Sequence, residues 1–267
     1  MSGLITASNY NPLELTDRVR RAVTRSGLSD VEERRYYRFR GGRWYGGIAT
    51  GDVVGCNLRC GFCWSWREAS HRMVEGSFYK PEGVFRRLIS IADTRGYRSV
   101  RLSGGEPTIS RRHVLKLLEL FENTSYTFIL ETNGILIGAD NTYAEELASY
   151  RNLIVRVSLK GTSREEFQTL TLAEPSFFEY QLKALKNLVD AGLEPGRRVY
   201  SAVMLSFSNS ENYESLRSRL AEIHPTLSEE VDEEYVILYP HVVKLLKTRG
   251  LKPRIAYKPE GIPASMI

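Results

Sequence analysis

The chemistry of this chain is concentrated in its only three cysteines. Cys56, Cys60 and Cys63 lie within eight residues, at the spacing C-x3-C-x2-C, in a segment (residues 55–66) that we call the cysteine loop. Thiolates are soft ligands that favour iron–sulfur clusters and zinc. A cluster usually takes four cysteines, so this set leaves one iron without a protein ligand. Open positions are typical of catalytic metal sites, and the pattern predicts an iron–sulfur cluster that a substrate or cofactor completes.

One histidine leaves an inorganic alternative open. His71 follows the last cysteine by eight residues, and it would complete a Cys3His zinc site. His113 and His224 read as ordinary helix-surface or helix-end residues.

A second candidate site follows the next predicted strand, in the run Leu-Ser-Gly-Gly-Glu-Pro. Gly104 and Gly105 allow the backbone to approach a ligand closely, and Glu106 offers a carboxylate to an ammonium group. Alone, this run is more typical of a turn. Its position after the strand that follows the cysteine loop is what makes it a candidate.

Polar side chains also follow three later strands. Asn133 stands in an Asn-Gly pair, which is otherwise a common turn. Ser158 and Lys160 alternate onto one face of their strand, although a lysine at a strand end is unremarkable by itself. His241 follows the last predicted strand, and a solvent-facing helix start is the alternative interpretation.

The elements that must position these residues are short β-rich runs alternating with amphipathic helices. We predict strands at 48–54, 99–102, 127–132, 154–159, 199–205 and 235–238, and helices at 82–94, 177–191 and 211–223. A further helix carries the apolar stripe Val114, Leu117, Leu118 and Phe121, and Ser163 with Glu166 forms a capping-box pattern.

Six strands alternating with helices imply parallel pairing through right-handed crossovers. We therefore predict an α/β fold, a partial (β/α)6 TIM-type barrel over residues 46–267, preceded by a basic N-terminal extension over residues 1–45. An open doubly wound sheet is the alternative. In such architectures functional groups gather at the C-terminal ends of the strands, where the cysteine loop would lie.

Composition narrows the classes of protein. The 267 residues contain no apolar run long enough to span a membrane, and clustered cysteines favour a reducing compartment, so we expect a cytoplasmic protein without a membrane partner. The net charge of +5 suits either a generally basic surface or an acidic partner, such as a ferredoxin-like donor or RNA. Residues 17–43 carry nine arginines against four acids, interleaved with aromatic residues; they suit nucleic-acid binding or, alternatively, a solvated cover over a barrel end.

Together these motifs resemble the radical S-adenosylmethionine (SAM) superfamily, whose hallmark is C-x3-C-x-(aromatic)-C, and Phe62 stands at the aromatic position. The resemblance is greatest to the pyruvate formate-lyase activating enzyme group, although Ser158 stands where that group usually has Asp, and Tyr and Pro are transposed before His241. It implies a 4Fe-4S cluster on Cys56, Cys60 and Cys63, and SAM held by the following residues: Gly104, Gly105, Glu106, Asn133, Ser158, Lys160 and His241.

The resemblance also implies an activity. SAM would bind the open iron, and one electron from a low-potential ferredoxin or flavodoxin would cleave it to a 5'-deoxyadenosyl radical that abstracts hydrogen. Three cysteines cannot also ligate an auxiliary cluster. The substrate classes that remain are a protein loop, as in glycyl-radical activation, RNA, or a small deazapurine-like molecule. A metal-stabilised module that binds RNA or protein is the non-enzymatic alternative.

Overall fold

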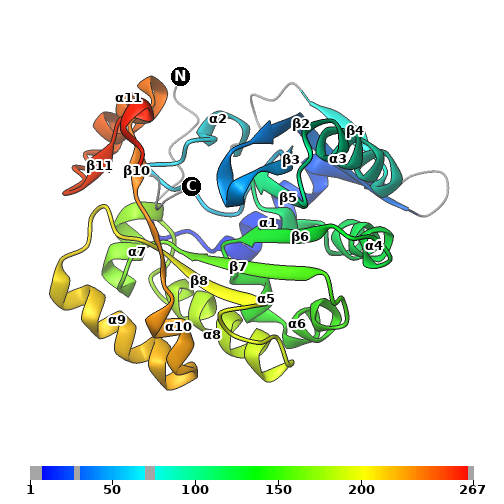
Figure 1. The fold of residues 1–267 in the computed structure, drawn as a ribbon. Coiled ribbons are helices and arrows are strands. Elements are labelled where there is room, and N and C mark those ends of the chain that lie inside the picture. The colour runs from blue at the N-terminus through cyan, green and yellow to red at the C-terminus, as the bar shows by residue number, and fades with distance from the viewer. Residues whose placement is uncertain (1–7, 27–30, 70–75, 264–267) are drawn as a thin grey trace.

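Six parallel strands form the centre of the molecule in a computed structural model that describes residues 8–26, 31–69 and 76–263 (Figure 1). In spatial order they are β3 (Ile48–Val53), β5 (Ser99–Gly104), β6 (Thr127–Thr132), β7 (Leu153–Leu159), β8 (Val199–Met204) and β9 (Asp232–Glu234). Each neighbouring pair is parallel. The predicted α/β fold with a partial (β/α)6 barrel is confirmed, and the ladder of the described strands stays open.

Helices follow the strands along the chain, and several of them cover the outer face of the sheet, whereas the last one lies beside the short strands near the C-terminal end (Figure 1). Their bounds are α1 (Pro12–Val23), α2 (Trp66–Ala69), α3 (Pro81–Arg95), α4 (Arg111–Glu122), α5 (Ile135–Ala139), α6 (Asn141–Ala148), α7 (Arg164–Thr171), α8 (Phe177–Asp190), α9 (Ser210–Ile223), α10 (Pro225–Glu229) and α11 (Pro240–Arg249). Short 3-10 turns occur at η1 (Trp44–Gly46), η2 (Pro107–Ile109) and η3 (Pro259–Gly261). No helix in the described part of the chain is both long and apolar enough to cross a bilayer.

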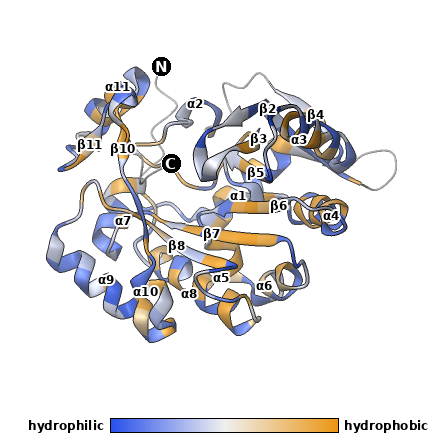
Figure 2. Cartoon of the chain, viewed as in Figure 1, coloured by the Kyte–Doolittle hydropathy of each residue, from blue (hydrophilic) through white to orange (hydrophobic). Residues whose placement is uncertain are grey.

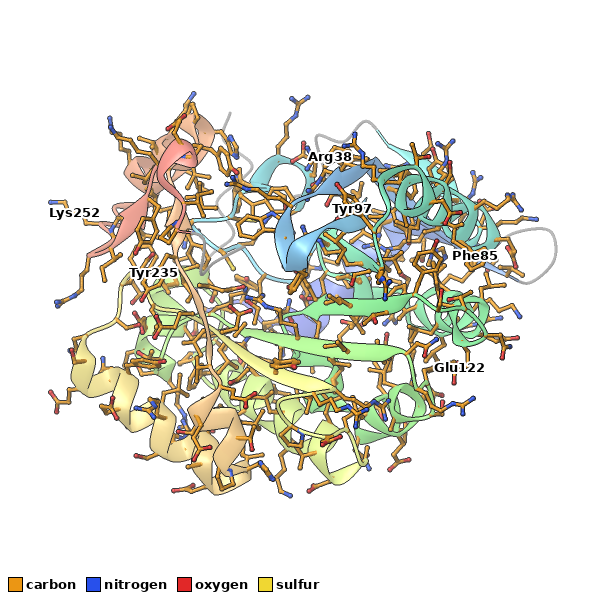
Figure 3. The ribbon with its side chains drawn as sticks, viewed as in Figure 1. Arg38, Phe85, Tyr97, Glu122, Tyr235 and Lys252 are labelled. Carbon is orange, nitrogen blue, oxygen red and sulfur yellow. The ribbon has the colours of Figure 1, made fainter. Side chains whose placement is uncertain are left out.

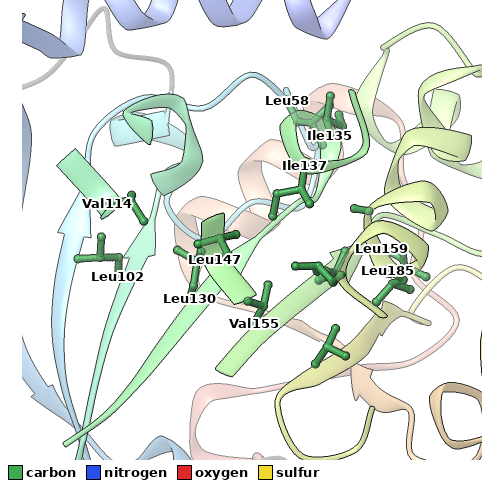
Figure 4. Packing of buried hydrophobic residues seen from close by; sticks show 14 of the residues in the cluster. Leu58, Leu102, Val114, Leu130, Ile135, Ile137, Leu147, Val155, Leu159 and Leu185 are labelled. Carbon is green, nitrogen blue, oxygen red and sulfur yellow. The ribbon is translucent and has the colours of Figure 1, made fainter. Parts of the chain in front are cut away.

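The hydrophobic core lies between the sheet and the covering helices. Leu102, Leu130 and Val155, from three neighbouring strands, are fully buried with Val114 of α4 and Leu185 of α8 (Figure 4). Orange, the colour of hydrophobic residues, marks parts of the same strands in Figure 2. Because side chains alternate across a strand, the residues between these apolar positions point to the inner face of the partial barrel. The core therefore fixes which polar side chains line that interior.

The N-terminal part of the chain extends this sheet. Strand β2 (Glu32–Gly42) pairs antiparallel with β3, and both β1 (Thr24–Ser26) and β4 (Ser77–Tyr79) pair with β2. The predicted boundary at residue 45 falls in the connection between β2 and β3, and the division into residues 1–45 and 46–267 stays a prediction. The bulky Arg34 and Tyr36 are among the largest fully buried side chains of the protein. Part of the arginine-rich segment is therefore core rather than surface.

Two predictions were wrong in detail. The sixth parallel strand is β9 and not residues 235–238, because β10 (Val236–Ile237) pairs with β11 (Ala256–Tyr257) in a separate two-stranded sheet. The prediction looked for apolar residues, which residues 236–237 supply, whereas the residues of β9 are acidic. His113 is completely buried, and its ring nitrogens lie 2.9 Å from the hydroxyl of Tyr36 and 2.9 Å from the carbonyl oxygen of Glu32. His224 caps α10, as a helix-end residue does.

Candidate active site

The cysteine loop and the Gly-Gly-Glu segment (residues 104–106) meet at the C-terminal ends of β3 and β5. The backbone N–H of Gly105 donates to the carbonyl of Val53 at 2.8 Å, and that of Glu106 donates to the carbonyl of Gly55 at 2.8 Å. A Cβ on Gly105 would lie 2.2 Å from the Gly55 oxygen, so only glycine permits this approach. Gly104 has a φ of +92°, which also favours glycine.

The three thiols lie in a partly covered environment with hydrogen-bond donors nearby. Cys60 is buried, whereas Cys56 and Cys63 are half-buried. The backbone N–H of Leu58 lies 3.3 Å from the sulfur of Cys56, and the hydroxyl of Ser65 lies 3.6 Å from that of Cys63. Burial raises the pKa of Cys56 to about 12 and raises those of Cys60 and Cys63 as well. Coordination of a metal must therefore displace thiol protons.

This donor set fits an iron–sulfur cluster, because the thiols share one loop and the backbone N–H of Leu58 lies near the sulfur of Cys56, whereas the Ser65 hydroxyl beside Cys63 donates to the carbonyl of Gly104. A second observation concerns Tyr37. Its buried hydroxyl has no hydrogen-bond partner among the residues that the structure describes, and it lies 3.0 Å from where a Cβ of Gly104 would stand. An unpartnered polar atom beside this glycine fits a polar ligand there.

The zinc alternative rests on a residue that lies outside the described ranges, His71. In the described part of the chain, no three His, Cys, Asp or Glu side chains are gathered around a position for one metal ion.

The carboxylate of Glu106 joins two of the strand ends. It is 2% exposed, and one oxygen accepts hydrogen bonds from the Thr108 N–H (3.1 Å), the Thr108 hydroxyl (2.6 Å) and the Thr132 hydroxyl (2.8 Å). The other oxygen accepts from the Asn133 N–H at 2.8 Å. These four bonds hold the end of β5 against the end of β6. The predicted contact of Glu106 with an ammonium group stays a prediction.

Asn133 connects this arrangement to the cysteine loop. Its side-chain amide donates to Asn57 at 2.7 Å and lies 3.9 Å from the sulfur of Cys56. Asn57 in turn donates to the Thr16 hydroxyl of α1 at 3.1 Å. Sequence reasoning named Asn133 but missed Asn57, although its position directly after the first cysteine could have pointed to it. The loop is thus held from both β6 and the N-terminal helix.

Ser158 and Lys160 share an acidic partner that sequence reasoning missed. The hydroxyl of Ser158 donates to Glu234 at 2.6 Å, and the ammonium of Lys160 lies 3.6 Å from the same oxygen and contacts Ser158. The other oxygen of Glu234 accepts from Arg156 at 2.7 Å. Burial opposes ionisation of Glu234, but the charges of Lys160 and Arg156 outweigh it and lower its pKa to about 2. This carboxylate is ionised at neutral pH.

A second charged network lines the inner face one strand away. Glu131 accepts from Arg101 (2.7 Å), Ser103 (2.7 Å) and Tyr45 (2.8 Å). Burial raises the pKa of Glu131, but Arg101 and Arg156 outweigh it and lower that pKa. Because the alternate residues of these strands are apolar and packed outward, the charged ones face inward. Alternation of charge within the predicted strands was the signal that could have found them.

His241 lies at the start of α11 and contacts the cysteine loop. Its Nε2 is 2.7 Å from the carbonyl oxygen of Trp64, and its ring stacks on Tyr239 with centroids 5.7 Å apart. The side chain is exposed, as a helix start allows. No ligand contact of His241 is established by this geometry, and its lining role stays a prediction.

Comparison with known families decides the class of enzyme. The model of the radical SAM superfamily matches residues 52–220, which include the cysteine loop, the Gly-Gly-Glu segment and strands β5 to β8. The chain belongs to the radical SAM superfamily. Radical SAM enzymes use a 4Fe-4S cluster and SAM, so the cofactors expected from the sequence are confirmed.

Among curated relatives, the chain is 30% identical over 180 residues to a protein named "Probable GTP 3',8-cyclase" from Saccharolobus islandicus, covering 64% of this chain and 54% of that protein. A protein of the same name from Saccharolobus solfataricus is 26% identical over 232 residues, covering 79% and 70%. The chain spans about half the length of the first of these relatives. These two relatives are named as cyclases and not as activating enzymes.

Solved structures share the fold of this radical SAM enzyme. Spore photoproduct lyase in complex with a dinucleoside spore photoproduct gives a TM-score of 0.56 at 14% identity, covering 96% of this chain and 73% of that one. Streptococcus suis SuiB bound to the precursor peptide SuiA gives 0.51 at 21% identity, covering 76% and 46%. At these identities the likeness concerns the fold alone.

Proposed function

We propose that this radical SAM enzyme acts on a small polar substrate of the purine-nucleotide class, bound on the inner face of the partial barrel. Cys56, Cys60 and Cys63 would hold the cluster, and residues 104–106 with Ser158 and Lys160 would hold SAM. When bound, the cluster and SAM supply the 5'-deoxyadenosyl radical that abstracts hydrogen. The protein positions the reactants and keeps water out.

The charged inner face is the observation that carries this proposal. Arg101 and Arg156 offer N–H donors that suit phosphate oxygens, and Glu131 and Glu234 are carboxylates held ionised beside them. A guanine base presents adjacent N–H groups, which a carboxylate accepts, and a ribose presents hydroxyls. A nucleotide therefore matches both signs of charge that line this interior.

The relatives support the same class. The two curated relatives described above are named as GTP 3',8-cyclases. Glycyl-radical activation, which the sequence resemblance favoured, is not shown by these matches, and a glycine in a protein loop has no charged group to engage paired arginines and glutamates. It stays an untested prediction, as does RNA as the substrate.

The test is to reconstitute the enzyme without oxygen, reduce it with dithionite, and measure 5'-deoxyadenosine in the presence of GTP, ATP or guanosine, each deuterated on the ribose. We expect one purine nucleotide to stimulate cleavage and to transfer deuterium to 5'-deoxyadenosine. Glu131→Gln should weaken this stimulation while leaving the basal cleavage of SAM, and Glu119→Gln on the exposed face of α4 is the matched control.

If no purine nucleotide stimulates cleavage while transfer RNA or a glycyl-radical protein does, the proposed substrate class is wrong. Deuterium transfer from one of those macromolecules would identify the class that replaces it.

A further inference from the structure

The segment at the C-terminal end of the chain concentrates unpaired positive charge. Residues 244–258 contain six cations and no acid. Five of these cations are exposed, and none pairs with an acidic side chain in the described ranges: Lys244, Lys247, Lys252, Arg254 and Lys258. The side chain of Ile255 stands among them at 46% exposure. In Figure 2, α11 shows both blue and orange residues, and Figure 3 shows Lys252 at the outer edge of the segment.

We call residues 244–258 the basic segment, and it rests directly on the cysteine loop. Arg249 donates to the carbonyl of Arg59 at 2.7 Å. A Cβ on Gly61 would lie 2.6 Å from Leu251, so the Leu251 side chain covers the backbone between Cys60 and Cys63. The basic segment is therefore a surface that lies directly against the backbone between the cluster ligands, whereas Arg38 and Arg40 reach the loop only at the Trp64 ring.

The arginine-rich segment at the N-terminal end differs in one physical respect, because many of its charges are internally neutralised or buried. Arg38 and Arg40 share the buried carboxylate of Asp52 at 2.7 and 2.8 Å, and Arg25 pairs with Glu33 at 2.6 Å. Arg34 is fully buried. An incoming acidic protein would find less free charge on that face.

We propose that the basic segment is the docking surface for an acidic, low-potential electron-donor protein that carries a flavin or an iron–sulfur centre. This inference rests on the proposed assignment of the cluster to the cysteine loop. The donor loses one electron and the cluster gains it, with no bond made or broken and no proton transferred. Charge complementarity steers the encounter, and an apolar residue inside a charged rim is the usual anatomy of such an interface.

The test compares a protein donor with a small one. Flavodoxin or ferredoxin, photoreduced in an anaerobic stopped-flow instrument, would reduce the reconstituted enzyme, and dithionite would reduce it in parallel. The variant carries Lys244→Glu, Lys247→Glu and Lys252→Glu. We expect its second-order rate constant with the protein donor to fall about tenfold or more at low ionic strength, while the rate with dithionite stays unchanged.

The matched control reverses three exposed arginines of the N-terminal segment: Arg18→Glu, Arg21→Glu and Arg43→Glu. It should reduce at the wild-type rate with either donor. If the charge-reversed variant fails to fold, the Lys→Gln triple variant and the salt dependence of the wild-type rate replace it, because added salt screens exposed charges over about 10 Å at 0.1 M.

Equal rates for wild type and variant with the protein donor overturn the proposal, as does a loss confined to the control. If the variant is still reduced by the protein donor at the wild-type rate but no longer binds transfer RNA, the basic segment is a nucleic-acid-binding surface instead. SAM cleavage driven by dithionite reports the cluster chemistry independently of the donor, so failure of the docking proposal is distinguishable from failure of the proposed function.

Discussion

Replacing Glu106 with Gln tests whether this side chain organises the site or directly holds a ligand. The substitution keeps the size of the side chain but exchanges one acceptor oxygen for an NH2 donor. In the wild type, four protein groups donate to the carboxylate, and two of them are backbone N–H groups, of Thr108 and Asn133. Whichever way the amide is oriented, one of these N–H groups faces an NH2 and loses its acceptor.

The magnitude follows from these contacts. A buried N–H without an acceptor costs about 1–3 kcal/mol, and the remaining bonds weaken because they are no longer charge-assisted. We expect the free energy of unfolding of Glu106→Gln to fall by about 2–4 kcal/mol. For a chain of this size, the thermal midpoint should drop on the order of 10 °C. The affinity for SAM should fall as well, because residues 104–106 lose their anchor at the end of β6.

The assay is urea unfolding of the protein together with SAM binding to the reconstituted enzyme. Glu119→Gln makes the same chemical change at an exposed position and should alter the free energy of unfolding by less than about 0.5 kcal/mol. A Glu106→Gln protein that is as stable as wild type yet has lost SAM affinity would refute the reasoning. That result would mean that the carboxylate faces the ligand and not Thr108, Thr132 and Asn133.

Three further predictions concern other parts of the molecule. Burial lowers the pKa of His113 to about 4, whereas the unfolded chain keeps the ordinary value of 6.5, so the unfolded chain takes up the proton first as the pH falls below 6.5. The free energy of unfolding should therefore fall by about 1.4 kcal/mol per pH unit between pH 6 and 4.5. In urea titrations, His113→Gln should remove that slope. Gly105→Ala places a methyl group 2.2 Å from the Gly55 oxygen, and we expect a loss of about 3 kcal/mol or more, read as a lower thermal midpoint; an unchanged midpoint would show that the two loops separate easily. Arg249→Met removes the hydrogen bond to the carbonyl of Arg59 and should accelerate loss of iron to a chelator severalfold, whereas Lys247→Met on the exposed face of α11 should not.

Sequence reasoning located the elements whose signals are local. The strands β3 and β5 carry β-branched and apolar residues, interspersed with polar ones, and the helix at 111–122 carries a regular apolar stripe. The three cysteines and the Gly-Gly-Glu run lie at the strand ends where parallel topology must gather them. For these features, chain order and periodicity were sufficient.

The features that escaped prediction depend on long-range pairing. Glu234 lies in an acidic strand, β9, whose charge is neutralised by Arg156 of β7 and by Lys160 directly after it. These partners lie two strands away in the sheet, and no local pattern shows them. His113 is buried because Tyr36 and Glu32, about 80 residues earlier, offer it hydrogen bonds. The arginine-rich segment read as surface, yet Arg34 is fully buried and donates to the carbonyls of residues 23 and 106.

The central claim is tested most directly by anaerobic reconstitution with iron and sulfide, reduction with dithionite, and assay of added SAM for 5'-deoxyadenosine, with the EPR spectrum of the reduced cluster recorded in parallel. We predict that SAM changes the EPR signal, that 5'-deoxyadenosine forms, and that both effects vanish when Cys56, Cys60 or Cys63 is changed to Ala. Two results would contradict the account. One is a colourless, zinc-loaded protein. The other is a fully loaded and reduced cluster whose EPR signal does not change when SAM is added, in an enzyme that forms no 5'-deoxyadenosine.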